Sequence, residues 1–90
     1  MKAILYNIKG KVQGVGFRYF VIKEASKLRL VGYAKNLHNG NVEVYAIGDE
    51  KDLTLLETKL EIGPPGSRVL EVTKKEVEIN IHYKSFIVEY

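Results

Sequence analysis

The sequence predicts an α+β fold in which one mainly antiparallel β-sheet carries two helices on a single face. Three observations lead to this prediction. Hydrophobic residues alternate with a period of two in several short segments, whereas two other segments repeat them every three or four residues. An Asn-Gly pair joins two of the period-two segments, which is the strongest short signal for a β-hairpin. A sheet with both helices on one face is the economical way to bury two amphipathic stripes.

The first strand and the first helix are predicted from a change of period near residue 17. Over residues 3–12, Ile4, Tyr6 and Ile8 fall on one face, as in a strand with one buried side. From residue 17 onward, hydrophobic residues recur at helical spacing and charged residues fall mostly on the other side. The buried stripe of this predicted helix comprises Phe17, Phe20, Val21, Ala25 and Leu28.

Residues 31–37 and 42–47 are predicted to form a hairpin whose turn is Asn39-Gly40. Both residues of an Asn-Gly turn can adopt positive φ at low cost. Asp49 is expected to cap a second helix. The buried stripe of that helix comprises Leu53, Leu56 and Leu60.

The last third of the chain is predicted to hold a turn and two strands. Gly63-Pro64-Pro65-Gly66 is the turn, and the strands are expected near residues 68–78 and 84–89. The resulting order, β-α-β-β-α-β plus a short C-terminal strand, is the plan of the ferredoxin-like α/β sandwich. Because no linker or repeat interrupts the order, residues 1–90 are expected to form a single domain. Many unrelated activities use this fold, so function has to be argued from individual residues.

Composition excludes several kinds of chemistry. The absence of cysteine removes disulfides, thiolate nucleophiles and the usual zinc sites. His38 and His82 lie far apart, without metal-ligand spacing around them, so neither is expected to be a metal ligand. No apolar run approaches the ~20 residues that span a bilayer, and a cytoplasmic location away from membranes is expected. The net charge of +3 comes from scattered lysines rather than a basic arm, which argues against nucleic acid as a partner.

The segment Gly10-Lys11-Val12-Gln13-Gly14-Val15-Gly16-Phe17-Arg18 is the most informative part of the chain for chemistry. Its glycines surround the predicted strand-to-helix turn, and Arg18 falls in the first turn of the helix. Such a turn can direct backbone N–H groups and the positive end of the helix at an anion, while a guanidinium matches two phosphate oxygens. A plain glycine turn with Arg18 in solvent explains the same residues, and the dinucleotide and NTP-binding patterns do not fit. Spacing alone leaves both interpretations open.

The same nine residues resemble the signature of the acylphosphatase family, G-x-V-Q-G-V-x-F-R. Further blocks that resemble the family follow in order: Gly32-Tyr33-Ala34-Lys35-Asn36-Leu37, Asn39-Gly40-Asn41-Val42-Glu43-Val44, Gly63-Pro64-Pro65-Gly66-Ser67-Arg68-Val69 and Phe86-Ile87-Val88. The resemblance implies the ferredoxin-like fold and the hydrolysis of small acyl phosphates to a carboxylate and inorganic phosphate, without metal or cofactor. It also implies that Arg18 and Asn36 are catalytic and that Gly10 to Val15 form the phosphate-binding loop.

So few catalytic groups suffice for an acyl phosphate because its carboxylate departs without needing a proton. Phosphoryl transfer then requires charge neutralisation on the equatorial oxygens and in-line placement of the nucleophile. Arg18 and the loop N–H groups are expected to hold the phosphoryl group, Asn36 to orient a water, and Gln13 to shape the loop. Without the resemblance, Asn36 is explained as a strand-end residue that bonds the hairpin backbone.

Three alternatives accompany this interpretation. An RNA-binding module on the same fold needs aromatic residues that alternate on a strand, whereas the segment 16–21 has helical spacing. A domain of a larger carbamoyl-transfer protein is a second possibility, although the start at Met1 and the end within the final strand favour a free-standing protein. A monomer is expected by default for a domain of this size. A catalytically idle relative is the third, and Arg18 and Asn36 argue against it. Arg29 stands where relatives commonly have glycine, and a left-handed conformation there would be strained by ~1–2 kcal/mol.

Overall fold

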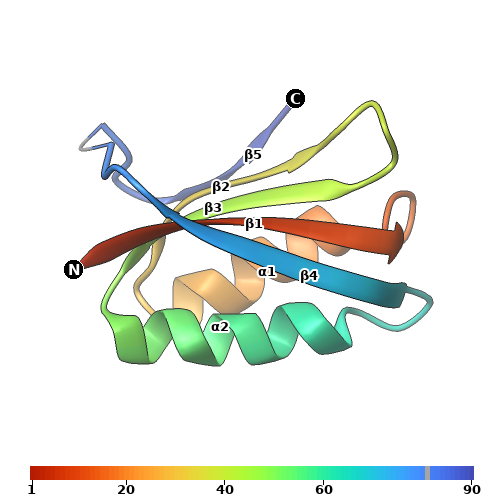
Figure 1. The fold of residues 1–90 in the computed structure, drawn as a ribbon, viewed down its shortest axis with the longest axis horizontal. Helices are drawn as coiled ribbons and strands as arrows, with labels where there is room; N and C mark the ends of the chain where they lie inside the picture. The colour runs from red at the N-terminus through yellow and green to blue at the C-terminus, as the bar shows by residue number, and fades with distance from the viewer. Residues whose placement is uncertain (81) are drawn as a thin grey trace.

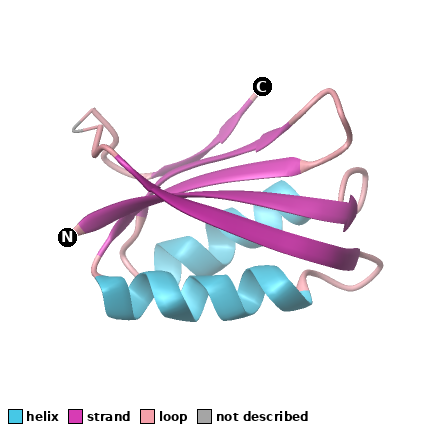
Figure 2. Cartoon of the chain, in the orientation of Figure 1, coloured by secondary structure: helices cyan, strands magenta, loops and turns pink. Residues whose placement is uncertain are grey.

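A computed structural model describes residues 1–80 and 82–90, and its five strands and two helices follow the predicted order (Figures 1 and 2). The elements are β1 (Lys2–Lys11), α1 (Phe17–Lys27), β2 (Val31–Asn36), β3 (Val42–Gly48), α2 (Glu50–Ile62), β4 (Arg68–Val77) and β5 (Phe86–Glu89). The largest displacement from a predicted strand boundary is the start of β5, at residue 86 instead of 84.

The strands form one sheet in the order β4-β1-β3-β2-β5. All neighbouring pairs are antiparallel except β2 and β5, which run parallel. Both helices lie under the same face of the sheet (Figure 1). The ferredoxin-like plan predicted from periodicity is therefore confirmed, including the mainly antiparallel sheet.

The main core lies between the helices and the sheet, as the two patterns predict. From β1, Tyr6 and Ile8 are buried on this side, with Phe17 and Val21 from α1 opposite them. The leucine stripe of α2 is buried throughout, and the Tyr6 hydroxyl donates a hydrogen bond to the Leu53 carbonyl at 3.3 Å. The helix stripes thus fix α1 and α2 against the sheet, and α1 thereby receives a defined starting point at the end of β1.

A second cluster covers the face of the sheet that carries no helix. The rings of Tyr33, Tyr45 and Tyr83 lie 5.5–5.8 Å from one another. The Tyr45 hydroxyl donates to the Glu78 carbonyl at 2.7 Å and accepts from the Asn80 N–H at 2.8 Å. These bonds attach the connection between β4 and β5 to the sheet, which brings β5 alongside β2.

The connection between β2 and β3 differs from the predicted turn. Gly40 has a positive φ of 94°, but Asn39 does not, so the pair does not form a two-residue turn with positive φ at both positions. The connection spans residues 37–41 and is closed by the Leu37 N–H, which donates to the Asn41 carbonyl at 2.9 Å. A longer connection needs positive φ at fewer positions than a two-residue turn does. Asn39 contributes through its side chain instead, because Oδ1 accepts the Asn41 N–H at 3.0 Å.

Two helix boundaries tested expectations about single residues. Asp49 occupies the N-cap position of α2, as predicted, although its side chain makes no capping hydrogen bond. The carboxylates of Glu50 and Asp52 lie in the first turn, where negative charge favours the positive end of the helix. Arg29, just beyond α1, has a φ of 59°, which confirms the left-handed conformation that its position suggested.

Candidate active site

The start of α1 leaves its positive end without a neutralising group. Gly16 occupies the N-cap position in the left-handed region (φ 77°, ψ 22°), where it offers no side-chain acceptor to the helix. The first turn contains no acidic residue, and Arg18 stands there instead. The first N–H groups of any helix lack acceptors within the helix, so these donors are available to an anion.

The loop before α1 is shaped by a second left-handed glycine and by one glutamine. Gly14 has a φ of 75°, and a Cβ on it would meet no other atom within 4 Å. Glycine is therefore required here by backbone conformation and not by lack of space. Gln13 Nε2 donates to the carbonyls of Leu37 and Asn41, at 2.7 and 2.9 Å. The Gln13 side chain thus fastens the loop to the β2–β3 connection.

Loop, helix and strand together surround a hollow of about 140 Å³, which we call the α1 hollow. Its lining residues are Val12, Gly14, Gly16, Phe17, Arg18, Tyr19 and Asn36. Asn36 is the last residue of β2 and pairs with Val42 of β3. The sheet therefore carries Asn36 to the same hollow as Arg18, although the two residues belong to different elements.

The lining differs in part from the predicted loop. Gly10 and Lys11 belong to β1, and neither they nor Gln13 and Val15 line the hollow. Gly10 lies at an irregularity in the β1–β4 pairing, and a Cβ on it would overlap the Arg68 carbonyl oxygen. The close approach of β1 and β4 therefore explains why residue 10 is a glycine.

Three lining residues were absent from the predicted set of site residues: Gly16, Phe17 and Tyr19. All three lie at or inside the first turn of α1. Their proximity to Arg18 in the sequence, together with the free N–H groups of a first helical turn, was the signal that could have identified them.

The polar side chains of the α1 hollow are free of competing partners. Arg18 forms no ion pair with any carboxylate of residues 1–80 and 82–90. Its Cζ lies 5.1 Å from the centroid of the Tyr90 ring. Within the same residues, no hydrogen bond engages the Asn36 side chain, so the hairpin-bonding explanation of this residue gains no support. Arg18, residues of the first turn of α1 and Asn36 therefore line one small space.

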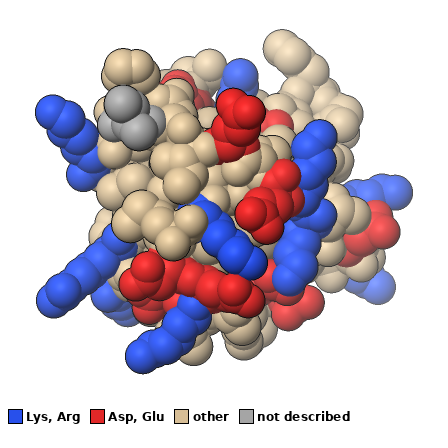
Figure 3. All heavy atoms as spheres, turned by 60° about the vertical axis from the view of Figure 1, so that its left-hand side comes forward, with Lys and Arg blue, Asp and Glu red and all other residues tan. Residues whose placement is uncertain are grey.

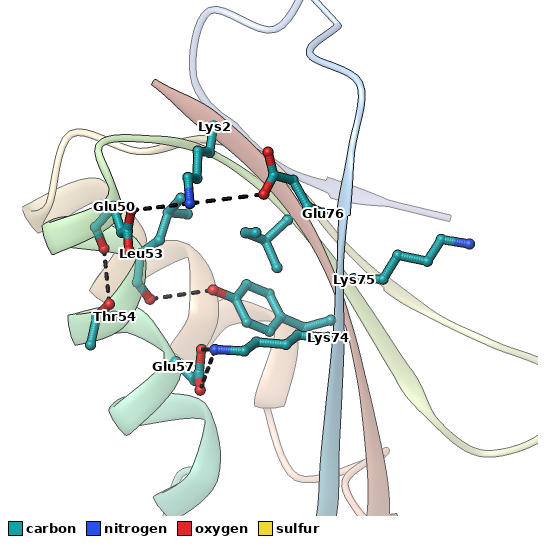
Figure 4. Close-up of a pocket in the computed structure, with 10 residues that line it drawn as sticks. Lys2, Glu50, Leu53, Thr54, Glu57, Lys74, Lys75 and Glu76 are labelled. Carbon is teal, nitrogen blue, oxygen red and sulfur yellow. Dashed lines mark hydrogen bonds and ion pairs between the residues drawn. The ribbon is translucent and has the colours of Figure 1, made fainter.

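A larger hollow of about 280 Å³, the α2 hollow, lies between α2, β1 and β4 (Figure 4). Ile4, Tyr6 and Leu53 are among its apolar lining residues. Two of its three lysines are paired: Lys2 Nζ lies 3.0 Å from Glu50 and 3.8 Å from Glu76, and Lys74 Nζ lies 2.9 Å from Glu57.

The charges around the α2 hollow make it a poor anion site. The hydrogen bond and the charge of Glu50 raise the pKa of Lys2, which keeps that ammonium committed to its partner. Figure 4 shows the third lysine, Lys75, pointing away from the paired side chains. A ligand phosphate would therefore have to displace glutamates before it could bind.

The remaining surface features bear on the other function classes. On the face drawn in Figure 3, basic and acidic side chains are intermingled without a continuous basic patch. In the described part of the chain, no helix is long and apolar enough to cross a membrane, and no three His, Asp or Glu side chains gather as metal ligands do. The rings of Phe17, in the core, and Phe20, partly buried against it, lie 5.9 Å apart, and both belong to α1 instead of to the sheet surface that RNA stacking requires.

Comparison with known proteins gives a consistent result over the whole chain. The sequence model of the family described as Acylphosphatase matches residues 4–88. An acylphosphatase of Archaeoglobus fulgidus is 43% identical over 90 residues, which cover 100% of both chains. The crystal structure of acylphosphatase from Bacillus subtilis superposes with a TM-score of 0.95 at 37% identity, again over 100% of both chains. HypF of T. kodakarensis matches with a TM-score of 0.88 at 35% identity, over 100% of this chain and 12% of that chain.

Proposed function

The chain belongs to the acylphosphatase family, and we propose that the α1 hollow is where it hydrolyses acyl phosphates to a carboxylate and inorganic phosphate. Acyl-phosphate hydrolysis is the activity that the family supports. One observation carries the assignment of the site. Arg18, which has no carboxylate partner in the described chain, and Asn36, whose side chain makes no hydrogen bond there, line the same hollow. This hollow lies at the start of α1, whose first turn contains no acidic residue.

Arg18 and the backbone N–H groups at the start of α1 bind the phosphoryl group in this proposal. The guanidinium donates to two phosphate oxygens at once, and the N–H groups around Gly14 to Gly16 face the remaining charge. Gly10, Lys11, Val12, Gln13 and Val15 support this loop through the strand end, the core and the hairpin bonds. Charge neutralisation of this kind is the main requirement of phosphoryl transfer.

Asn36 orients the attacking water in this proposal. A carboxamide has no useful pKa near neutrality, but its oxygen accepts a hydrogen bond from water and its NH2 group donates to the oxygen of attack. The departing carboxylate needs no proton, and the proton of the water passes to the substrate phosphate. The reaction thus proceeds without a general acid, a metal or a cofactor.

The small size of the α1 hollow favours substrates recognised by their phosphate. Its volume of about 140 Å³ and its polar lining residues suit the phosphoryl group, while the acyl group extends toward solvent. We expect breadth toward small acyl phosphates for this reason. We further propose that residues 1–90 act as one monomeric domain in the cytoplasm, and sedimentation velocity of the purified chain tests the monomer directly.

The decisive experiment is hydrolysis of benzoyl phosphate by the purified protein, measured with and without EDTA. Retained hydrolysis in EDTA, with inorganic phosphate as a competitive inhibitor, supports the proposal. Absence of hydrolysis with both benzoyl and acetyl phosphate, or activity that EDTA abolishes and a divalent metal restores, contradicts it. A crystal soaked in orthophosphate tests the site itself, because an anion bound elsewhere and an empty α1 hollow would refute the assignment.

A further inference from the structure

Tyr19 differs from the other apolar side chains that line the α1 hollow because most of its surface is exposed. Val12 and Phe17 are 1% and 2% exposed, so they offer a ligand almost no surface, whereas Tyr19 is 65% exposed. In the proposed function the phosphoryl group occupies this hollow, and the acyl group extends past the lining residues. On the basis of that function, we propose that the Tyr19 ring forms the acyl subsite and that it makes aromatic acyl phosphates the preferred substrates.

The position of Tyr19 in α1 directs its side chain toward the loop before the helix. Tyr19 is the third residue of the helix, which begins at Phe17. The Cα–Cβ bond of a helical residue is tilted toward the N-terminus of the helix, so a side chain covers the turn that precedes it. The Tyr19 side chain therefore leans back toward Gly16 and toward the free N–H groups of the first turn. It is thus placed to meet a group attached to a phosphoryl group bound there.

The glycines of the loop leave space beside the ring. A Cβ on Gly14 or on Gly16 would meet no other atom within 4 Å. An acyl group that leaves the hollow along this side is therefore not obstructed by the loop, and Tyr19 is the exposed apolar side chain beside it. A planar acyl group can lie against the tyrosine ring in the offset or edge-to-face arrangement that aromatic pairs prefer.

The fold itself gives no reason for a tyrosine at this position. Among residues 1–80 and 82–90, the Tyr19 ring joins no aromatic pair and its hydroxyl makes no hydrogen bond. The next residue, Phe20, pairs with Phe17 instead. Tyrosine is also a weaker helix former than alanine, lysine or glutamate. Replacement of Tyr19 should therefore leave the fold intact, which separates its role from stability.

The contact should affect substrate binding more than the chemical step. The acyl group stays beside the ring while the bond between phosphorus and the carboxylate oxygen breaks, so the contact is similar in the ground state and the transition state. Loss of such uniform binding raises KM and leaves kcat unchanged. A residue that supported the hollow structurally would instead alter the reaction of every acyl phosphate and the affinity for inorganic phosphate.

The experiment compares hydrolysis of benzoyl and acetyl phosphate by wild type, Tyr19→Ala, Tyr19→Phe and the control Leu55→Ala. Leu55 is a large side chain of α2 that is 48% exposed and lines neither hollow. We expect Tyr19→Ala to raise KM for benzoyl phosphate about three- to tenfold, the range of one aromatic pair, with acetyl phosphate KM and phosphate Ki changed by less than about twofold. Tyr19→Phe and Leu55→Ala should match wild type. Comparison between variants cancels the difference in leaving group between the two substrates.

Three kinetic results would overturn the proposal. Equal losses with both substrates would mean that Tyr19 supports the hollow instead of contacting the acyl group. An unchanged KM for benzoyl phosphate in Tyr19→Ala would mean that the ring does not meet the substrate. A loss in Tyr19→Phe as large as that in Tyr19→Ala would assign the contact to the hydroxyl and not to the ring.

Binding of stable analogues separates this inference from the proposed function. Benzoylphosphonate and acetylphosphonate have a P–C bond in place of the P–O bond that hydrolysis breaks. The ring ¹H signals of Tyr19, assigned by their loss in Tyr19→Ala, should shift more with benzoylphosphonate than with acetylphosphonate or inorganic phosphate. Equal shifts, or no shift with any of the three, would refute the acyl subsite even in an enzyme that hydrolyses both substrates. A larger shift with benzoylphosphonate in a protein without hydrolytic activity would support the subsite and refute the proposed function.

Discussion

The two helices of this molecule each begin beside a hollow, and the two starts have opposite electrostatic character. The first turn of α2 carries Glu50 and Asp52, and Lys2 and Lys74 at its hollow are paired with glutamates. The first turn of α1 carries no acid, and Arg18 there has no carboxylate partner in the described chain. The α2 hollow is the larger of the two, but Lys2 and Lys74 in its lining already have carboxylate partners. Unpaired donors, and not volume, therefore distinguish the anion site.

The largest effect is expected from Arg18→Lys. We predict a loss of at least about 100-fold in kcat/KM for benzoyl phosphate, because a point ammonium cannot replace a planar fork that contacts two oxygens. Lys74→Ala, at the α2 hollow, is the control and should leave kcat/KM unchanged. Wild-type turnover in Arg18→Lys would contradict the proposal that the start of α1, unlike that of α2, binds the phosphoryl group through a guanidinium.

Asn36→Ala should have the next largest effect, on a different parameter. We expect kcat to fall about 10- to 100-fold, the range for loss of one donor that acts in the transition state. The phosphate Ki should change little, since the lost interaction is made to water and not to the phosphoryl group. Parallel losses in kcat and in phosphate affinity would mean that Asn36 supports the hollow structurally.

Tyr6→Phe tests whether Tyr6, which lines the α2 hollow, has a purely structural role. Burial, followed by the charge of Glu57, raises the pKa of Tyr6 above its ordinary value of 10.0. The folded state therefore holds the phenol proton more tightly, so the stabilisation is fully present below pH 10 and is lost as the pH rises further. At pH 7 we expect Tyr6→Phe to lose about 1 kcal/mol of unfolding free energy with the Leu53 hydrogen bond, without loss of activity.

The readout for Tyr6→Phe is urea unfolding at several pH values. The stability difference between wild type and variant should shrink between pH 10 and pH 11. A constant difference across that range would mean that the Tyr6 phenol is not the titrating group.

The smallest effect is expected from Glu57→Gln, which breaks the pair with Lys74. Both side chains retain solvent contact, so the pair should contribute at most about 0.5 kcal/mol of unfolding free energy. Added salt at about 1 M should abolish even this difference, because it screens exposed charges. A loss above about 2 kcal/mol, or any loss of activity, would show that the α2 hollow does more than join helix to sheet.

Most of the fold was predictable because each element has a distinct period. The alternation of Tyr6 and Ile8 and the helical spacing of Leu53, Leu56 and Leu60 are properties of neighbouring residues, and both survive in the core. The conformation of the β2–β3 connection was not predictable in detail, because it includes hydrogen bonds to a distant residue, Gln13. No local pattern records such bonds.

Site residues were predictable from the sequence only where they are close together in the chain or belong to a motif that resembles the family. Gly14 and Arg18 lie on either side of one helix start, so their proximity follows from the sequence. The convergence of Asn36 on Arg18 depends on the register of β2 against its neighbours, which spacing cannot give. The sequence suggested that Gly10 lies in the loop, but it lies in β1 beside β4. A Cβ on Gly10 would overlap the carbonyl oxygen of Arg68.

The two hydrogen bonds of Gln13 have a consequence for protein engineering. One carboxamide clamps two carbonyls of the neighbouring 37–41 connection, so the two segments form a single mechanical unit. If residues 12–18 alone were transplanted into another scaffold, Gln13 would lose both hydrogen bonds, and the loop before the helix would lose this support. Lengthening the 37–41 connection by one residue in the native chain should loosen that bend from a distance, although it replaces no group that meets the substrate.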